Sequence, residues 1–305
     1  MAGDGPVVVI GGTGMLGGQV VTALLDRGKR VRALVRPASD AGQLEQAGAE
    51  IARGDMMDPA SLLGAMDGAD AVVTTAAGYT RHSQGDTPEI DMAGNRNLAD
   101  AASRAGIRRF VLTSILTCDK TPQIPHFWHK KLAEDRLQEL DVPFVSLRPG
   151  AFLDMIARMG GDPFAKRQLM GFGDTTVPLT YVLTSDLAGY LVDAVDAPGV
   201  DGQRIDIGWD RPVSMQDIAQ ISGKLLGEEI SVMGAGPTRP ASTAEAAPED
   251  QSNEMANDLN AMLQWFESGQ YVADTARQRE VFGEVPTAED AIARFIRSLG
   301  HAVIG

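Results

Sequence analysis

The chain has 305 residues, enough for one large domain or for one and a half, and enough to bury a sizeable core. Its 27 basic and 41 acidic residues give a net charge of −14, which disfavours direct nucleic-acid binding unless the fold gathers a hidden basic patch. The one cysteine, Cys118, excludes an internal disulfide, and no apolar run approaches the ~18 residues that predict a membrane span.

A glycine-rich turn near the N-terminus is the strongest signal in the sequence. It joins the strand-forming run 7–10 to a helix pattern that continues to Leu25, and it reads as G-x-G-x-x-G from Gly12 or G-x-x-G-x-x-G from Gly11. Such glycines permit a tight turn and close backbone approach to a pyrophosphate, whose charge the helix N-terminus attracts. The predicted dinucleotide site contains Gly11, Thr13, Gly14, Met15, Leu16 and Gly17.

The second strand predicts which dinucleotide binds. Residues 29–36 alternate polar and apolar side chains, as a half-buried strand does, and end on Arg36 where an NAD-binding fold carries an acid. An arginine suits the dianionic 2′-phosphate, which favours NADP(H) over NAD(H). Two alternatives stay open: Arg32 shares or takes over this role, or Arg36 is only a solvated surface residue.

The next strands add residues at the same edge of the predicted sheet. Asp55 follows a short strand at 50–52, where an acid can accept a hydrogen bond from an adenine amino group. Alternatively, it caps the helix that begins near Pro59, although Asp58 is the better cap. The remaining cofactor residues predicted here follow or end strands, and they are Met56, Ala76, Ala77, Thr113 and Pro149.

Strands and helices continue to alternate along the first half of the chain. The pattern predicts a loop at 79–88, a helix at 90–105 capped by Gly106, a strand at 108–114, a helix at 126–140 and a strand at 143–149. This alternation predicts an α/β fold with a doubly wound parallel sheet. In the helix at 126–140, His126 and Lys130 lie one turn apart, and Lys130 is spaced to pair with Glu134.

Five segments together resemble the NmrA-like, atypical branch of the short-chain dehydrogenase/reductase superfamily. They are GGTGMLGG from Gly11, GDMMDPASLLGAMDGADAVV from Gly54, RRFVLTS from Arg108, KKLAEDRL from Lys130 and VPFVSLRPGAF from Val142. The resemblance implies a Rossmann fold with an NADP-binding core at 1–150, to which a strand at 203–208 returns. It also implies that residues 151–305 mostly form a substrate-binding or lid region.

The resemblance implies an active site of Ser, Tyr and Lys, with Y-x-x-x-K on one helix. The pattern K-x-x-x-E-x-x-L places the lysine at Lys130, with Lys131 as its rival. The tyrosine position then holds His126, which puts reductase chemistry in doubt, although a histidine can exchange a proton near neutral pH. Ser114 is the nearest serine, while a strict match falls on Ile115.

The rest of the chain is less informative. Four apolar residues are candidates for a substrate pocket or for plain core, namely Phe127, Trp128, Phe152 and Met155. Residues 234–254 are rich in Pro, Ala, Ser, Glu and Gly, which predicts a flexible linker or lid. The histidines lack metal-ligand spacing, so no metal is predicted. No signal-peptide pattern precedes the first strand, which predicts a cytoplasmic location.

Two functions of different classes follow. The first is an NADP(H)-dependent oxidoreductase acting on a small, fairly apolar carbonyl- or enol-type substrate, without direct binding to nucleic acid or membranes. The second is a non-catalytic NADP(H)-binding redox sensor of the NmrA type, which the missing tyrosine favours. A sugar-nucleotide epimerase is weaker, because such enzymes normally keep the tyrosine. The sequence leaves the oligomeric state open.

Overall fold

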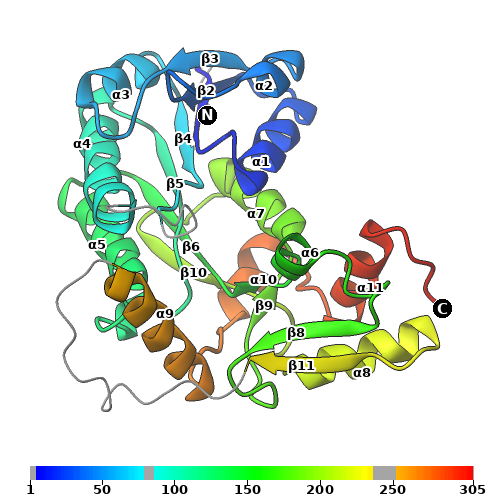
Figure 1. Ribbon diagram of the computed structural model, residues 1–305. Helices are drawn as coiled ribbons and strands as arrows, with labels where there is room; N and C mark the ends of the chain where they lie inside the picture. The colour runs from blue at the N-terminus through cyan, green and yellow to red at the C-terminus, as the bar shows by residue number, and fades with distance from the viewer. Residues whose placement is uncertain (1–4, 79–85, 236–251, 305) are drawn as a thin grey trace. The chain divides into compact units, whose positions relative to one another are not determined.

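The computed structural model describes residues 5–78, 86–235 and 252–304, which fall into two compact units (Figure 1). The first unit is Met1–Arg148 with Ser185–Ile205, and the second is Pro149–Thr184 with Asp206–Gly305. No helix in the described ranges is long and apolar enough to cross a membrane.

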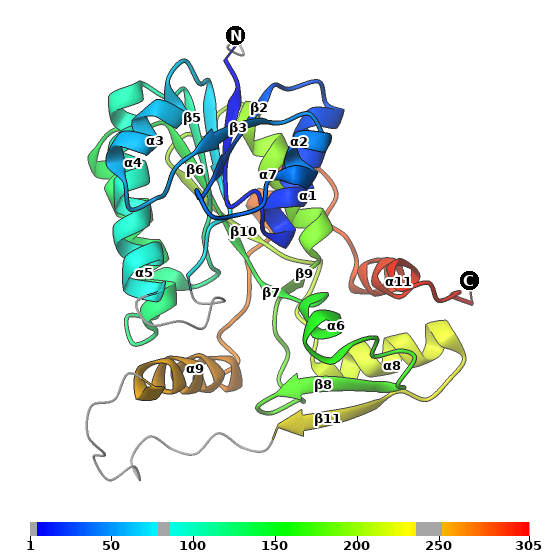
Figure 2. The same ribbon diagram turned by 45° about the horizontal axis from the view of Figure 1, so that its top comes forward.

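The first unit is built on a seven-stranded sheet in the order β10-β6-β5-β4-β1-β2-β3. Every neighbouring pair from β3 across to β6 is parallel. Helices α3, α4 and α5 cover one face of this sheet, and α1, α2 and α7 cover the other (Figure 2). This arrangement confirms the predicted doubly wound α/β fold.

The elements of this sheet and its helices are short and regular. In chain order they are β1 (Val7–Ile10), α1 (Met15–Asp26), β2 (Val31–Val35), α2 (Gly42–Gln46), β3 (Glu50–Arg53), α3 (Pro59–Met66), β4 (Ala71–Thr74), the π-helix η2 (Asp86–Gly94), α4 (Asn95–Ala105), β5 (Arg109–Thr113), the 3₁₀ turn η3 (Cys118–Lys120), α5 (Pro125–Glu139), β6 (Phe144–Pro149), α7 (Thr184–Asp196) and β10 (Gln203–Ile207).

Local sequence explains where several of these elements begin and end. All four residues of β1 are buried, because this strand lies between β2 and β4 and is covered on both faces. Asp58 caps α3 by accepting from the Ala60 N–H, and Pro59 occupies the first turn. Gly106 ends α4 in the left-handed conformation, at a φ of 64°, which confirms the predicted cap.

The second unit has its own core and two small parallel sheets, one pairing β11 with β8 and the other β7 with β9. Helix α8 begins with a capping box between Ser214 and Asp217 and ends at Gly227. The elements are β7 (Ala151–Phe152), α6 (Met155–Gly160), β8 (Gln168–Phe172), β9 (Tyr181–Val182), α8 (Met215–Leu226), β11 (Ser231–Ala235), α9 (Ser252–Glu267), α10 (Ala276–Phe282) and α11 (Ala288–Ser298).

Three predicted segments differ from the structure. Residues 86–88 belong to η2, not to a loop, and the rest of the predicted loop lies outside the described residues. The predicted linker at 234–254 is wrong at both ends, because 234–235 complete β11 and 252–254 begin α9. Its remaining residues, 236–251, lie outside the described ranges. The sequence pattern at 176–182 also predicts a strand, but only Tyr181 and Val182 form one.

Candidate functional site

The glycine turn between β1 and α1 combines a left-handed residue with a very close backbone approach. Gly11 has a φ of 86° and accepts a 2.9 Å hydrogen bond from the Gly14 N–H. A Cβ on Gly17 would lie 2.1 Å from the Gly11 carbonyl oxygen, whereas a Cβ on Gly12 would make only ordinary contacts from 3.5 Å. The backbone geometry therefore requires glycine at Gly11 and Gly17 but not at Gly12, which favours the spacing that begins at Gly11.

The N-terminus of α1 suits an anion. Gly14 is the N-cap and, having no side chain, makes no side-chain cap hydrogen bond to the first amides of the helix. Thr13 is exposed, Met15 is half-buried and Leu16 packs into the interior. The unpaired N–H groups and the helix dipole together favour a phosphate at this end.

The loop after β4 lies directly beside the glycine turn. The Thr75 N–H donates to the Ile10 carbonyl oxygen at 2.9 Å, and a Cβ on Gly11 would lie 2.8 Å from Thr75 Oγ1. β1 and β4 are also the strands at which the order of the sheet reverses, where ligands bind in such folds. The predicted residues Ala76 and Ala77 follow at this edge, half-buried and exposed.

Arg36 is exposed at the end of β2 and forms no ion pair within the described part of the chain. Arg53, at the end of β3, donates from Nη1 to the carbonyl oxygens of Arg36 at 3.2 Å and Ser39 at 2.7 Å. Arg53 is not among the residues predicted from the sequence, although its position follows from the register that pairs Val35 with Arg53. Two cations without an acidic partner among the described residues therefore lie side by side at this edge.

Arg32 is not available to bind the 2′-phosphate of NADP(H), a role that the sequence left open to it. Its Nε donates to Glu50 at 2.8 Å, and its Nη1 donates to the carbonyl oxygens of Ala65 and Asp67, each at 2.8 Å. These bonds join β2 to β3 and to the end of α3. Arg32 is therefore a structural residue, and of the two candidates only Arg36 keeps its guanidinium for a ligand.

Asp55 closes a local turn. Its Oδ1 accepts from the Met57 N–H at 2.9 Å, and its own N–H donates to Ser61 Oγ at 3.0 Å. The helix cap is Asp58, so capping does not account for Asp55. Met56 is buried, and its carbonyl oxygen accepts from Asn97. Contact of Asp55 with an adenine ring stays a prediction.

Lys130 extends from α5 to the loop after β4. Its Nζ donates to the Ala76 carbonyl oxygen at 2.7 Å and lies 3.5 Å from Oδ1 of Asp91, and both charged side chains are buried. The predicted pair between Lys130 and Glu134 is wrong, because Glu134 binds two arginines instead. Lys131, the rival candidate, pairs with Asp135 one turn away on the half-buried side of α5.

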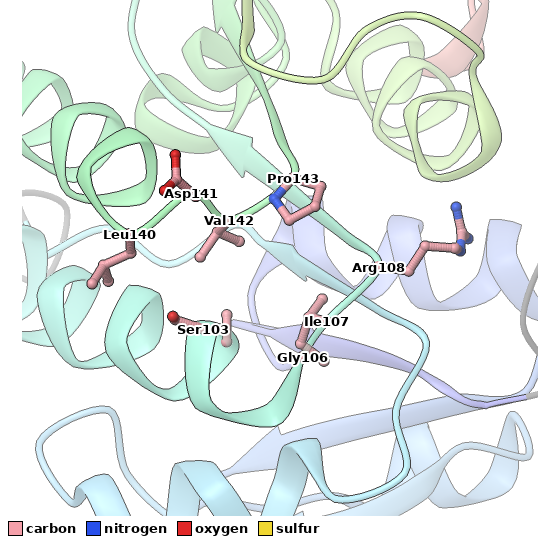
Figure 3. A pocket seen from close by; sticks show the side chains of 9 residues that line it. Ser103, Gly106, Ile107, Arg108, Leu140, Asp141, Val142 and Pro143 are labelled. Carbon is pink, nitrogen blue, oxygen red and sulfur yellow. The ribbon is translucent and has the colours of Figure 1, made fainter.

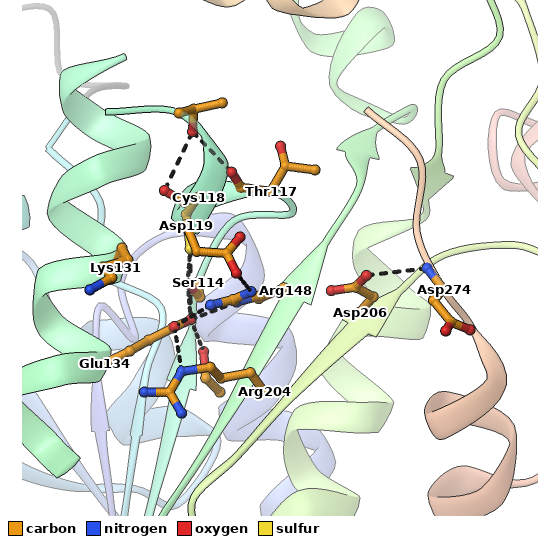
Figure 4. A network of polar contacts seen from close by, with 12 residues as sticks. Ser114, Thr117, Cys118, Asp119, Lys131, Glu134, Arg148, Arg204, Asp206 and Asp274 are labelled. Atoms are coloured by element: carbon orange, nitrogen blue, oxygen red, sulfur yellow. Dashed lines mark hydrogen bonds and ion pairs between the residues drawn. The ribbon is translucent and has the colours of Figure 1, made fainter. Parts of the chain in front are cut away.

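Glu134 is the centre of a buried polar cluster, shown in Figure 4. Its carboxylate accepts from Arg148 Nη2 at 2.6 Å, from Arg204 Nε at 2.9 Å and from the hydroxyls of Ser146 and Ser114 at 2.7 and 2.8 Å. Burial alone would raise the pKa of Glu134, but the hydrogen bonds and charge of Arg148, with the two serines, hold it below its usual value.

The same cluster determines the hydrogen bonding of Ser114 and the protonation of Cys118. Ser114 makes no hydrogen bond to Lys130 or His126 in the described residues, because its hydroxyl is held by Glu134. Burial, followed by the charge of Glu134, raises the pKa of the Cys118 thiol to about 12. Cys118 is therefore protonated at neutral pH and is not an activated nucleophile.

The other predicted residues fall into two groups, 126–128 on α5 and 152–155 in the second unit. His126 is buried in the first turn of α5, with its ring edge-on to Phe127 at 4.8 Å between centroids. Trp128 is half-buried, with Lys131 5.3 Å from its ring centroid. Phe152 and Met155 belong to the second unit and are half-buried. A shared substrate pocket stays a prediction.

Two predicted cofactor residues end neighbouring strands. Thr113, at the end of β5, is buried, and its hydroxyl has no hydrogen-bond partner among the described residues. Pro149 ends β6 and is also the first residue of the second unit, where its carbonyl oxygen accepts from Tyr271 at 3.4 Å. A role for either residue in binding the cofactor stays a prediction.

A cavity of about 350 Å³ lies at the amino ends of the strands, where β5 and β6 begin (Figure 3). Its position at the amino ends of the strands separates it from the glycine turn and from Lys130. It is lined by Ala102, Ser103, Gly106, Ile107, Arg108, Leu140, Asp141, Val142 and Pro143. Arg108 is committed there to Asp70 and Asp196. This cavity is not part of the candidate site.

Comparison with known proteins agrees with the geometry. A family model described as NAD(P)H-binding matches residues 11–198. Photosystem II assembly factor Ycf39 of Cyanophora paradoxa is 28% identical over 226 residues, covering 74% of this chain and 70% of that protein. NAD(P)H azoreductase of Xenophilus azovorans is 26% identical over 263 residues, covering 84% of this chain and 86% of that protein.

A solved structure shares the fold over nearly the whole chain. Triphenylmethane reductase of Citrobacter sp., solved in complex with NADP(H), matches with a TM-score of 0.72 at 18% identity, covering 95% of this chain and 99% of that one. Together these matches confirm the Rossmann fold and the family resemblance drawn from the sequence.

Proposed function

We propose that this chain, which belongs to the NAD(P)H-binding family, is an NADP(H)-dependent oxidoreductase acting on a small, fairly apolar carbonyl- or enol-type substrate. The observation that carries the proposal is the position of Lys130. Its ammonium is bonded to Ala76, one residue beyond Thr75, which contacts the glycine turn. A buried cation beside a dinucleotide turn is suited to bind ribose and to offset negative charge on a reacting oxygen.

The glycine turn fits a dinucleotide on physical grounds. Any side chain at Gly17 would overlap the Gly11 carbonyl, so only glycine at this position lets the backbone of the turn lie this close to helix α1. The uncapped amides at the start of α1 would bind the pyrophosphate. Arg36 supports a preference for NADP(H), since its guanidinium matches a 2′-phosphate better than a neutral hydroxyl.

The bound cofactor supplies a hydride from the nicotinamide C4. Lys130 would orient the ribose and stabilise an oxyanion on the substrate, and His126, one turn earlier on α5, is the proposed proton donor. Ser114 receives no role in this proposal, because its hydroxyl is held by Glu134. Phe127 and Trp128, on the same helix as Lys130, are the apolar residues proposed to contact substrate.

The first test is a fluorescence titration with NADPH and NADH on the wild type, Arg36→Ala and Lys130→Ala. We expect Arg36→Ala to weaken NADPH binding about tenfold or more while leaving NADH nearly unchanged, as loss of a charge-assisted contact predicts. Arg30→Ala, an exposed arginine at the other end of β2, is the matched control and should leave both affinities unchanged. Equal affinities for both nucleotides in the wild type would contradict the NADP(H) preference.

The second test is turnover of NADPH with a panel of quinones, aldehydes, azo dyes and triphenylmethane dyes. We expect turnover with at least one apolar acceptor, and a larger loss of kcat than of NADPH affinity in His126→Phe. Tight NADPH binding without any turnover would argue against the oxidoreductase.

A second candidate is a non-catalytic NADP(H)-binding regulatory or assembly factor. It is favoured by His126 standing where the resemblance implies tyrosine, and by the likeness to the assembly factor Ycf39. Three measurements distinguish the two candidates. A regulator should bind NADPH and NADP⁺ with clearly different affinities, show no turnover, and bind a protein partner in only one of these states.

A further inference from the structure

Asp91 is a buried carboxylate that joins three segments of the first unit. It lies in η2 with 1% of its side chain exposed, and both of its oxygens accept from the Gly78 N–H at 3.1 Å. Lys130 Nζ lies 3.5 Å from Oδ1, and the Asp91 carbonyl oxygen accepts from Asn95 Nδ2 at 2.8 Å. Asp91 therefore links η2 to the loop after β4 and to α5.

Burying the charged side chains of Asp91 and Lys130 has a free-energy cost. Each charged group loses its hydration in the interior, and an ion pair returns that free energy only when the geometry is good. The partners of this carboxylate include a backbone N–H and an ammonium, and the ammonium lies at a distance longer than a direct hydrogen bond. A hydrophobic pair would pack α5 on η2 at lower cost, so packing alone does not account for Asp91 and Lys130.

The ammonium of Lys130 keeps donor capacity. It has three N–H donors, of which one is donated to Ala76, while Asp91 attracts it without a short hydrogen bond. Asp91 and Ala76 thus both attract Nζ to the place where β4 ends. The remaining donor capacity can reach an oxygen of a bound ligand.

The element that carries Asp91 is itself unusual. η2 is a π-helix of nine residues that packs against α5. Its turns are wider than those of an α-helix, and π-helical segments are frequent at functional sites. Its last residue, Gly94, lies where a Cβ would be 3.0 Å from Met56 Cε and 3.3 Å from the Glu89 carbonyl oxygen, so this end of η2 is closely packed.

We propose that Asp91 is a positioning residue, which fixes the ammonium of Lys130 at the point where it binds cofactor or substrate oxygen. This inference rests on the proposed role of Lys130. It adds that this role depends on η2, because η2 carries Asp91. Asp91 acts on the ligand only through Lys130. A substitution at Asp91 should therefore have no effect on ligand binding once Lys130 is removed.

A double-mutant cycle tests this dependence in the full chain, with NADPH as the probe. Asp91→Asn keeps the shape of the side chain and an oxygen for the Gly78 N–H, but removes the charge. We expect it to weaken NADPH binding about tenfold in the wild type and less than about twofold in Lys130→Met, since residues in one network show such coupling. Thermal unfolding of all four proteins reports whether each variant folds.

The half-buried pair Lys131 and Asp135 on the same helix provides a matched control. Asp135→Asn and Lys131→Met should leave NADPH affinity unchanged, alone and combined. Equal loss of affinity for Asp91→Asn in both backgrounds would overturn the inference, because Asp91 would then act through the fold. Unchanged affinity in Lys130→Met would also overturn it, together with the role proposed for Lys130, while the preference for NADPH that Arg36 supports would stand. Failure of the wild type to bind NADPH would remove the proposed function as well.

Discussion

Gly17 and Gly18 are neighbours in α1, yet they have different surroundings. A Cβ on Gly17 would lie 2.1 Å from the Gly11 carbonyl oxygen, whereas a Cβ on Gly18 would meet its nearest neighbour at an ordinary 3.6 Å. Gly17→Ala must push the helix away from the turn, and we expect a loss of about 1–3 kcal/mol in the free energy of unfolding. NADPH binding should weaken with it.

Gly18→Ala is the matched control for this prediction. It removes a glycine from a helix without a clash, and it should stabilise the protein by up to about 1 kcal/mol. Urea unfolding and NADPH titration of the two variants provide the comparison. Similar effects of both substitutions would show that the close approach at Gly17 does not matter.

Residue roles could be predicted from sequence where they depend on near neighbours. The glycine turn was found because strand, turn and helix follow one another within 20 residues. The choice between Arg32 and Arg36 stayed open, because the carbonyl oxygen of Ala65 that commits Arg32 lies 33 residues away. Arg53 was missed for the same reason, since only the pairing of β2 with β3 brings it beside Arg36.

Helix α5 shows how an element can be placed correctly while its contacts are not. Its bounds agree with prediction within one residue, but the spacing of Lys130 and Glu134 suggested an ion pair between them. Both side chains are buried, and each has its charged partner on another element. Helical spacing shows which residues share a face, and it does not show whether that face is covered.

The carboxylate of Glu134 gives this helix a pH-dependent contribution to stability. Its pKa is lowered in the folded protein, so the contribution is present above the ordinary value of 4.5 and is lost as the pH falls through the lower folded-state pKa. Glu134→Gln leaves the buried Arg148 without this charge, and we expect a loss of about 3–5 kcal/mol at pH 7. The difference from wild type should become smaller below pH 4.5.

Glu139→Gln is the control on the same helix, because Glu139 is 64% exposed in its pair with Arg136. Exposed pairs contribute little, so we expect a change below about 1 kcal/mol at either pH. Denaturant unfolding at pH 7 and pH 4 measures both variants. A loss for Glu134→Gln that is the same at the two pH values would contradict the assignment.

Short elements of the second unit escaped prediction for a physical reason. β8 and β11 pair residues such as Leu169 and Val232, which lie far apart in the chain, and the strands contain glycine and methionine instead of a strong β pattern. Their existence depends on pairing, which a local pattern does not contain. The long alternating segment up to residue 149 was predicted better because its strands are buried apolar runs.

At the scale of the whole molecule, the first unit needs residues from far along the chain. Arg109 donates to the carbonyl oxygens of Ala194 and Ala197, and Arg204 binds Glu134 from β10. A fragment of residues 1–150 lacks α7 and β10, and it leaves these groups exposed or unpaired. We expect it to show no cooperative thermal unfolding and no NADPH binding.

The fragment 1–208 restores α7 and β10 and is the matched comparison. We expect it to recover a cooperative unfolding transition. NADPH at a hundredfold excess over Kd should raise its free energy of unfolding by about 2.7 kcal/mol. Circular dichroism and differential scanning fluorimetry measure both fragments. Cooperative, NADPH-stabilised unfolding of residues 1–150 would show that the returning segment is dispensable.

The position of Arg204, 70 residues after Glu134, also sets a time interval during protein synthesis. A ribosome adds about 5–20 residues per second, so Arg204 is made about 4–14 s after Glu134. During that interval β6 is the last strand of the sheet, and its open edge can pair with another nascent chain. Slow codons between residues 150 and 205 would lengthen this exposure, so we expect slower translation of this segment to lower the yield of folded protein.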